Sequence, residues 1–144
     1  MPGTNLTRAE AATRAELLHV DTYVVDLDLT TSESTFATTS TIRFTCTSSG
    51  AETFVDFVGG TVQEIVVNGT SLDPAEYSRD SRVRIPDLLA DNEVTIRATG
   101  HYTNTGEGLH RFVDPVDGEV YLYSQFEVPD CRRMFPVFEQ PDLK

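Results

Sequence analysis

Histidines, cysteines and scattered carboxylates are the side chains here that could bind a metal or activate water. His19, His101 and His110 do not form an H-E-x-x-H pattern, and Cys46 and Cys131 stand far apart. A zinc site needs a cluster of such ligands, so these spacings predict no metal site. The sequence also lacks the glycine patterns of phosphate-binding loops and the G-x-S-x-G pattern of hydrolases. We therefore expect no complete catalytic site and no metal ligands within these residues.

The run Glu119–Glu127 has a more informative pattern. Its even-numbered residues are mostly apolar, so this face is expected to enter the core. Its odd-numbered face is an ordinary solvent face or a docking or ligand surface, because tyrosine combines apolar area with a hydrogen-bonding tip. Alternation puts Gln125 and Glu127 on this second face, where both could point into one cleft. The odd-numbered residues are Glu119, Tyr121, Tyr123, Gln125 and Glu127.

The elements that would position these residues follow from periodicity. Thr7 and Glu10 form a T-x-x-E capping box, and the alanine-rich stretch after it predicts a helix that ends near Leu18. Asn68-Gly69 is a strong hairpin signal, because a type I′ turn needs positive φ at both central residues. Alternating or apolar runs predict strands at Tyr23–Leu29, Thr41–Thr47, Thr53–Val58, Val62–Val67, Arg82–Ile85, Asn92–Tyr102 and Glu119–Glu127.

Repeated short strands with turns between them predict a mainly β fold, an antiparallel sandwich or barrel-like sheet behind a short N-terminal helix. Two segments do not fit a plain sandwich. Thr103–Gly118 is expected to be a long loop, which is uncommon in a compact domain unless it is functional. The tail Glu127–Lys144 is rich in proline, phenylalanine, arginine and acidic residues.

Composition narrows the class of protein. The chain has 144 residues, enough for one domain, with 11 basic against 23 acidic residues and a net charge of -12. Such acidity argues against nucleic acid as a partner. The absence of a long apolar run argues against a membrane-spanning helix. Because Met1–Glu16 is polar, we expect no secretory signal, a cytoplasmic location, and reduced thiols at Cys46 and Cys131.

Several motifs carry a family resemblance. Tyr123-Ser-Gln-Phe-Glu127 is followed by Pro129-Asp-Cys-Arg-Arg133 and by Phe135-Pro-Val-Phe-Glu-Gln-Pro-Asp-Leu-Lys144. Together they resemble the signature of the aminopeptidase N family of zinc metallopeptidases, of the gluzincin class and actinobacterial type. The glycine-containing run Tyr102–Phe112 is similar to another motif of that family. Two positions depart from the pattern: Val137 stands where many members have cysteine, and Ser124 where many have threonine.

The resemblance implies a multidomain exopeptidase that removes N-terminal residues from peptides. In such enzymes a saddle-like N-terminal β-domain packs on a thermolysin-like domain, which carries G-x-M-E-N, H-E-x-x-H and a further glutamate. On this basis residues 1–144 are expected to be the N-terminal β-domain, without its last strands and without the catalytic domain. Zinc is implied for the full-length enzyme only. A sheet that lacks strands should leave an unpaired edge and exposed apolar area.

The resemblance also implies a site. Glu127 matches the residue that holds the α-ammonium group of the peptide, and Gln125 matches its neighbour in the same pocket. A carboxylate can bind –NH₃⁺ through charge-assisted hydrogen bonds, which strengthen when a closing domain lowers the dielectric. Arg132 and Arg133 are expected to be scaffolding that pins the tail by pairing with acidic neighbours. These acidic neighbours are Asp130, Glu139 and Asp142. The resemblance implies two partners for the chain, a peptide N-terminus and the catalytic domain.

A different class of function stays open. The amphipathic strand face and the acidic charge would also suit a stand-alone β-sandwich module that binds proteins or glycans. In either case the 144-residue chain is expected to be inactive alone, since none of its residues is arranged to activate water.

Overall fold

The structure is a computed structural model that describes residues 6–74, 77–78, 82–104, 108–125, 131–140 and 143. Its ladders are antiparallel, so the predicted mainly β class with an N-terminal helix is confirmed. The elements are α1 (Arg8–Leu17), β1 (Leu18–Asp28), β2 (Thr35–Cys46), β3 (Thr53–Asp56), β4 (Thr61–Val67), β5 (Thr70–Leu72), β6 (Tyr77–Ser78), β7 (Arg82–Ile85), β8 (Asp91–His101), β9 (Gly108–Val113), β10 (Val120–Gln125) and the 3-10 helix η2 (Cys131–Arg133).

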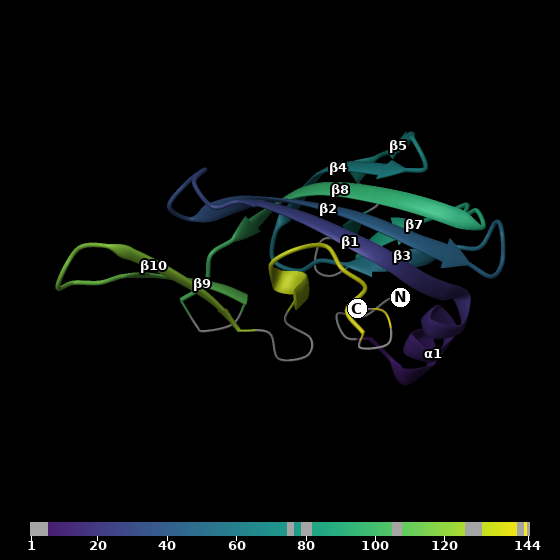
Figure 1. Ribbon diagram of the computed structural model, residues 1–144, viewed down its shortest axis with the longest axis horizontal. Coiled ribbons are helices and arrows are strands. Elements are labelled where there is room, and N and C mark those ends of the chain that lie inside the picture. The colour runs from purple at the N-terminus through teal and green to yellow at the C-terminus, as the bar shows by residue number, and fades with distance from the viewer. Residues whose placement is uncertain are drawn as a thin grey trace.

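The strands form three sheets. The largest has five strands in the order β1-β2-β8-β4-β5, so β1 and β5 lie at its edges. A three-stranded sheet has the order β3-β7-β6, and β9 pairs with β10 in a separate hairpin. Figure 1 shows this hairpin extending away from the rest of the molecule, while α1 lies at the opposite end.

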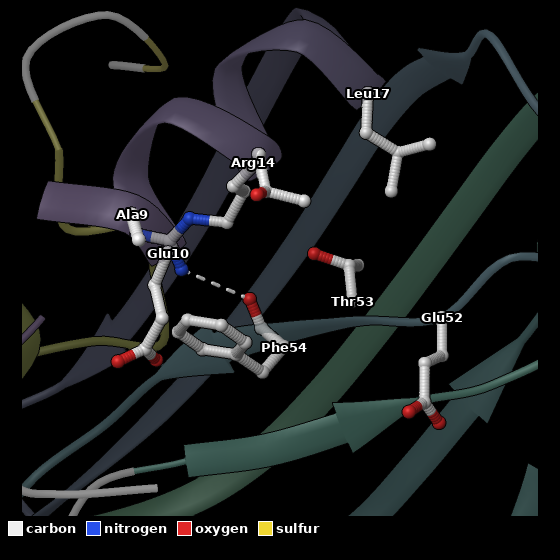
Figure 2. Close-up of a pocket in the computed structure, with 8 residues that line it drawn as sticks. Ala9, Glu10, Arg14, Leu17, Glu52, Thr53 and Phe54 are labelled. Carbon is white, nitrogen blue, oxygen red and sulfur yellow. Dashed lines mark hydrogen bonds between the residues drawn. The ribbon is translucent and has the colours of Figure 1, made fainter. Parts of the chain in front are cut away.

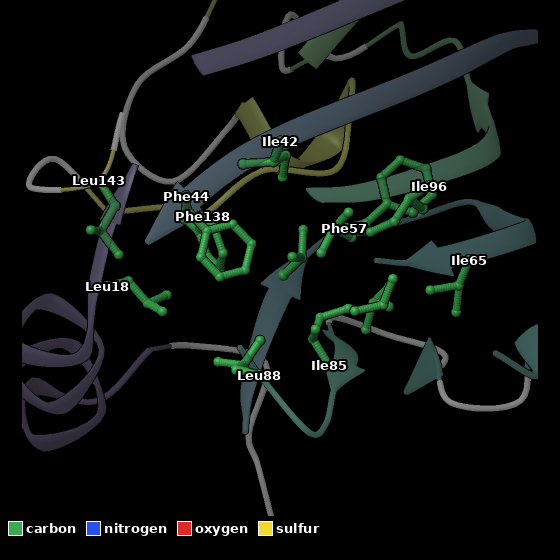
Figure 3. Packing of buried hydrophobic residues seen from close by; sticks show 14 of the residues in the cluster. Leu18, Ile42, Phe44, Phe57, Ile65, Ile85, Leu88, Ile96, Phe138 and Leu143 are labelled. Atoms are coloured by element: carbon green, nitrogen blue, oxygen red, sulfur yellow. The ribbon is translucent and has the colours of Figure 1, made fainter. Parts of the chain in front are cut away.

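The core lies between the two larger sheets. The alternation of β8 buries Val94, Ile96 and Ala98, as predicted, since successive side chains of a strand point to opposite faces. They pack with Phe57 and Phe138 in one continuous apolar cluster (Figure 3). Phe138 belongs to the tail, so the C-terminal segment is part of the core.

Two local signals read from the sequence are confirmed. The Thr7 hydroxyl accepts the amide of Glu10 at 3.1 Å, and the Glu10 carboxylate accepts the amide of Thr7 at 3.4 Å, which completes the capping box. The helix ends at Leu17, because Leu18 is extended and begins β1. Asn68 and Gly69 have φ angles of 51° and 82°, as a type I′ turn between β4 and β5 requires.

Other predictions need correction. Thr103–Gly118 is not one loop, because it contains β9, which is stabilised by pairing with β10 rather than by an apolar alternation of its own. The even face of β10 enters the core only in part: Leu122 is half-buried, but Val120 and Ser124 are exposed. The hairpin extends beyond the two packed sheets (Figure 1), so neither of these sheets packs over Val120 or Ser124.

Candidate functional site

The β9–β10 hairpin carries the strand in which the sequence places a binding residue. Its register pairs Tyr123 with His110 and Gln125 with Gly108. At its root Leu109 is buried in a second apolar cluster with Phe36 of β2 and Met134 of the tail. The hairpin is therefore fixed at the end where β9 begins and β10 ends, and its turn is remote from the core.

Large apolar side chains remain exposed along the hairpin. The rings of His110 and Tyr123 stack with centroids 4.5 Å apart. The Tyr121 hydroxyl donates a hydrogen bond to Asp117 at 2.6 Å, which lowers the pKa of that carboxyl group. The register places Phe112, Tyr121 and Tyr123 on one face of the hairpin, and an exposed apolar face of this kind is typical of a surface that contacts another protein segment. The exposed side chains are Phe112, Val113, Val116, Val120, Tyr121 and Tyr123.

The two predicted site residues are placed only in part. Gln125 ends β10, where its backbone pairs with Gly108, but its side chain and the whole of Glu127 lie outside the described residues. Their role as an amine anchor therefore stays a prediction. The structure does describe what precedes and follows Glu127, namely β10 on one side and η2 on the other.

Two hydrogen bonds of the Arg132 backbone, one from its amide and one to its carbonyl, attach η2 to the rest of the fold. The Arg132 amide donates to the Glu139 carboxylate at 2.7 Å, and its carbonyl accepts the amide of Val58 at 2.8 Å. Arg132 itself is buried. The expected pinning of the tail by Glu139 is present, and the backbone amide of Arg132 makes this contact; Asp130 and Asp142 lie outside the described residues.

Arg14 of α1 is the buried charge around which the tail is organised. Its Nη1 lies 2.9 Å from Asp56 Oδ2 and donates to the Phe54 carbonyl at 3.1 Å, while Nε donates to Gln140 Oε1 at 2.8 Å. The guanidinium also lies 4.4 Å from the Phe54 ring centroid. The side chains of Arg14 and Asp56 are both 2% exposed, so their attraction is little screened by water.

Asp56 joins the helix to the tail. The oxygen that accepts Arg14 Nη1 also accepts the backbone amide of Glu139 at 2.9 Å. The Asp56 backbone makes a two-bond bridge to Val137, at 2.7 and 3.0 Å. Gln140 adds a further connection, because its Nε2 donates to the carbonyl of Ala11 in α1 at 2.9 Å. Residues far apart in the sequence are thus held in one polar network.

Tyr23 of β1 holds the end of the tail. Its hydroxyl donates to the carbonyl of Leu143 at 2.8 Å and accepts the amide of Phe138 at 3.3 Å. Burial raises the pKa of Tyr23 above its ordinary value of 10.0. The tail therefore lies against β1 as well as α1 and β3.

A shallow pocket of about 270 Å³ lies between α1 and β3 (Figure 2). Glu10 forms an ion pair with Arg82 at its border, and the Arg82 guanidinium lies 4.1 Å from the Phe54 ring centroid. Burial, which raises the pKa of Glu10, is outweighed by hydrogen bonds from Arg82 and Thr7, which lower it. The lining carries two carboxylates and no nucleophile beside a base, so we assign it no chemistry. It consists of Ala9, Glu10, Thr13, Arg14, Leu17, Glu52, Thr53 and Phe54.

The described residues hold no metal-binding cluster. Among them, no group of three or more histidine, cysteine or acidic side chains is arranged to bind an ion. His19 is exposed, 3.7 Å from Asp21. Cys46 and Cys131 form no disulfide, and Cys46 is buried. No described helix is long and apolar enough to span a membrane.

Sequence reasoning missed the buried polar network. No local pattern in the sequence marks Arg14, Asp56 or Gln140 as members of one network. One signal was available: Arg14 stands within a stretch otherwise rich in alanine, and it is the buried residue of α1. Its partners are 42 and 126 positions away, beyond the reach of a local pattern.

Comparison with known proteins gives consistent matches. The family model described as the peptidase M1 N-terminal domain matches residues 19–144. Over the whole chain the sequence is 56% identical to the aminopeptidase N of Streptomyces lividans, and it spans 17% of that protein. It is 29% identical to "Probable aminopeptidase 1" of Sulfurisphaera tokodaii over 67% of this chain and 12% of that protein.

Solved structures show the same fold. The native leukotriene A4 hydrolase of Saccharomyces cerevisiae matches with a TM-score of 0.70 at 19% identity, over 88% of this chain and 22% of that one. The yeast enzyme in complex with bestatin also gives a TM-score of 0.70, over 96% of this chain and 26% of that one. The chain thus spans between 12% and 26% of the length of these relatives.

Proposed function

Since the chain belongs to the family of peptidase M1 N-terminal domains, we propose that it is the substrate-cleft domain of a zinc aminopeptidase. In this proposal residues 1–144 are the N-terminal β-domain of a longer polypeptide that removes N-terminal residues from peptides. The domain contributes an α-amine anchor but neither the zinc nor the general base, so it has no activity alone. Peptide N-termini are the substrates, and the catalytic domain of the same polypeptide is the main partner.

The anchor is Glu127, with Gln125 beside it. An exopeptidase must recognise a terminal –NH₃⁺, and a carboxylate that accepts its hydrogen bonds does so with charge assistance. Once the cleft closes, the lower local dielectric would strengthen this contact. Neither side chain lies within the described residues, so this assignment rests on the sequence motif alone.

The single observation that best supports the proposal is the exposed apolar face of the β9–β10 hairpin. Phe112, Tyr121 and Tyr123 stay exposed on an element that extends from the body and leads directly into the Gln125–Glu127 segment. A second domain packed against this hairpin would bury these side chains. It would also place its own active site next to the proposed amine anchor.

The β1 edge is where we propose that the longer protein adds strands. β1 pairs only with β2 in the described sheet, and its inward-facing Val25 and Leu27 are half-buried. The tail reaches β1 at Leu143, next to Tyr23. A strand added at this edge would satisfy its backbone groups and cover these apolar side chains. The incomplete domain and the cytoplasmic location remain predictions.

The test uses the longer protein and one substitution. Glu127→Gln removes the anchoring charge but keeps the shape, so we expect KM for an aminoacyl p-nitroanilide to rise about tenfold or more. Glu119→Gln, at the start of the same run, is the matched control and should leave KM unchanged. Unchanged KM in Glu127→Gln would refute the anchor. Turnover by the 144-residue chain with zinc added would refute the division of labour between domains.

The stand-alone binding module is the remaining alternative, and the exposed tyrosines of the hairpin would suit it as well. The coding sequence after Lys144 distinguishes the two functions. A continuous frame that contains G-x-M-E-N and H-E-x-x-H supports the enzyme, whereas a native stop supports the module. Binding of a protein or glycan ligand through Tyr121 and Tyr123 would then be expected instead.

A further inference from the structure

Helix α1 contributes a buried charge although it lies outside the matched family region, which begins at His19. We propose that Arg14 is a positioning residue for the amine-binding part of the cleft. Through Asp56 and Glu139 it holds η2 against the root of the β9–β10 hairpin, and so sets where the hairpin stands. This inference rests on the proposed function and extends it to a residue that neither the motif nor the family match includes.

The first link joins α1 to the tail through one carboxylate oxygen. Asp56 Oδ2 accepts both Arg14 Nη1 and the amide of Glu139, each at 2.9 Å. Without the guanidinium, the Asp56 charge would remain buried with only amide donors around it, which is unfavourable. Arg14 therefore holds the Asp56 carboxylate in place as the acceptor for the tail.

The second link joins the tail to η2. The amide of Glu139 donates to Asp56, which fixes the backbone of Glu139. Its side-chain Oε2 then accepts the amide of Arg132 at 2.7 Å. Val58, two residues after Asp56, donates its amide to the Arg132 carbonyl at 2.8 Å. The peptide groups on both sides of Arg132 are thus fixed relative to β3, the strand that Arg14 contacts.

The third link joins η2 to the hairpin. Gly108 begins β9 with φ 67°, and a Cβ atom at this position would lie 3.0 Å from the Cβ of Arg133. This close approach leaves little space for η2 to move relative to β9. Gly108 is also the register partner of Gln125, so a displacement of η2 is passed to the end of β10.

The contacts of Arg14 favour positioning over general support of the fold. Its polar partners are Phe54, Asp56 and Gln140, which belong to β3 and the tail. The ladders of the five-stranded sheet do not involve Arg14, and among the described residues Arg14 makes no hydrogen bond to that sheet. Removing the network should thus shift the tail and hairpin root while the large sheet stays folded.

The test compares neutral, charge-retaining and control variants of the longer protein. Arg14→Met/Asp56→Val removes both members of the buried ion pair at once, so neither is left without its partner. We expect KM for an aminoacyl p-nitroanilide to rise about tenfold with kcat within about twofold, because a misplaced cleft weakens binding. Arg14→Lys keeps the positive charge but loses the planar guanidinium group, so it should give a smaller rise. Arg43→Met, which removes an exposed ion pair with Glu93, should leave both parameters unchanged.

Hydrogen exchange in the 144-residue chain gives the second measurement. In Arg14→Met/Asp56→Val we expect the amides of Arg132 and Glu139 to lose protection, while those of β2 and β8 keep it. If β2 and β8 also lose protection, Arg14 supports the whole fold and the positioning role is wrong.

The KM measurements distinguish a failure of this inference from a failure of the proposed function. If Glu127→Gln leaves KM unchanged, the anchor itself is wrong. If Glu127→Gln raises KM but the Arg14 and Asp56 variant does not, the anchor stands and the positioning role is refuted.

Discussion

Nη1 of Arg14 lies 2.9 Å from Oδ2 of Asp56, and the two residues are 42 positions apart in the sequence. Both side chains are almost fully buried, unlike the ion pair of Arg43 and Glu93 on the sheet surface. A buried pair is costly to form but also costly to break, because removal of one partner strands the other charge. This pair joins α1 to β3, and the same Asp56 oxygen accepts the amide of Glu139 in the C-terminal segment.

The buried pair should matter far more for stability than the exposed one. Asp56→Ala is expected to lower the free energy of unfolding by about 3–5 kcal/mol. Glu93→Ala, whose partner Arg43 has a side chain 66% exposed, is expected to cost about 0–1 kcal/mol. Urea unfolding of the 144-residue chain at neutral pH measures both. Equal losses would contradict the structure.

Gly100 is expected to tolerate no side chain. A Cβ atom at this position would lie 2.3 Å from the Phe36 ring. Phe36 packs with Leu109 in the apolar cluster at the root of the hairpin. Gly100→Ala should therefore destabilise the chain by about 1–3 kcal/mol through overpacking. Combined with Phe36→Leu, which frees space, it should cost less than the sum of the single substitutions. A double-mutant cycle by urea unfolding checks this, and strict additivity would argue against the contact.

Tyr23 should make stability depend on alkaline pH. Burial raises its pKa in the folded state above 10.0, so its contribution is complete below pH 10 and is lost as pH rises beyond that value. Tyr23→Phe should cost about 1–3 kcal/mol at pH 7, because it leaves the amide of Phe138 and the carbonyl of Leu143 without this partner. The difference from the unmodified chain should shrink between pH 10 and 12. A difference in the free energy of unfolding that stays constant over this range would contradict the prediction. The control is Tyr123→Phe, which removes the hydroxyl of an exposed tyrosine.

The hairpin face should promote association of the 144-residue chain. Tyr121 and Tyr123 are 47% and 49% exposed, and we expect concentration-dependent self-association in sedimentation velocity. Tyr121→Ser/Tyr123→Ser should weaken it about tenfold or more, since burial of each ring contributes more than 1 kcal/mol. Leu89→Ser, at an equally exposed apolar residue elsewhere, is the control. A chain that stays monomeric at millimolar concentration would contradict the prediction.

Much of the fold could be predicted from local patterns. The capping box at Thr7, the type I′ turn at Asn68 and the alternation of β8 act over a few residues, so the sequence states them directly. Strand β9 could not be predicted, because its stability comes from its partner β10. Strand β2 begins at Thr35, earlier than predicted, because its threonine-rich first half is held by β1 and β8 on either side.

The sequence by itself determined the fold class, the tail motif with its family, and Gln125 and Glu127 as the candidate anchor. These depend on spacings within short segments. Only the tertiary structure decided that Arg14, Asp56, Glu139 and Gln140 form one buried network, and that the β9–β10 hairpin extends from the body with its aromatic face exposed. The physical reason is that burial of a charge, or exposure of a ring, depends on which distant segments pack around it.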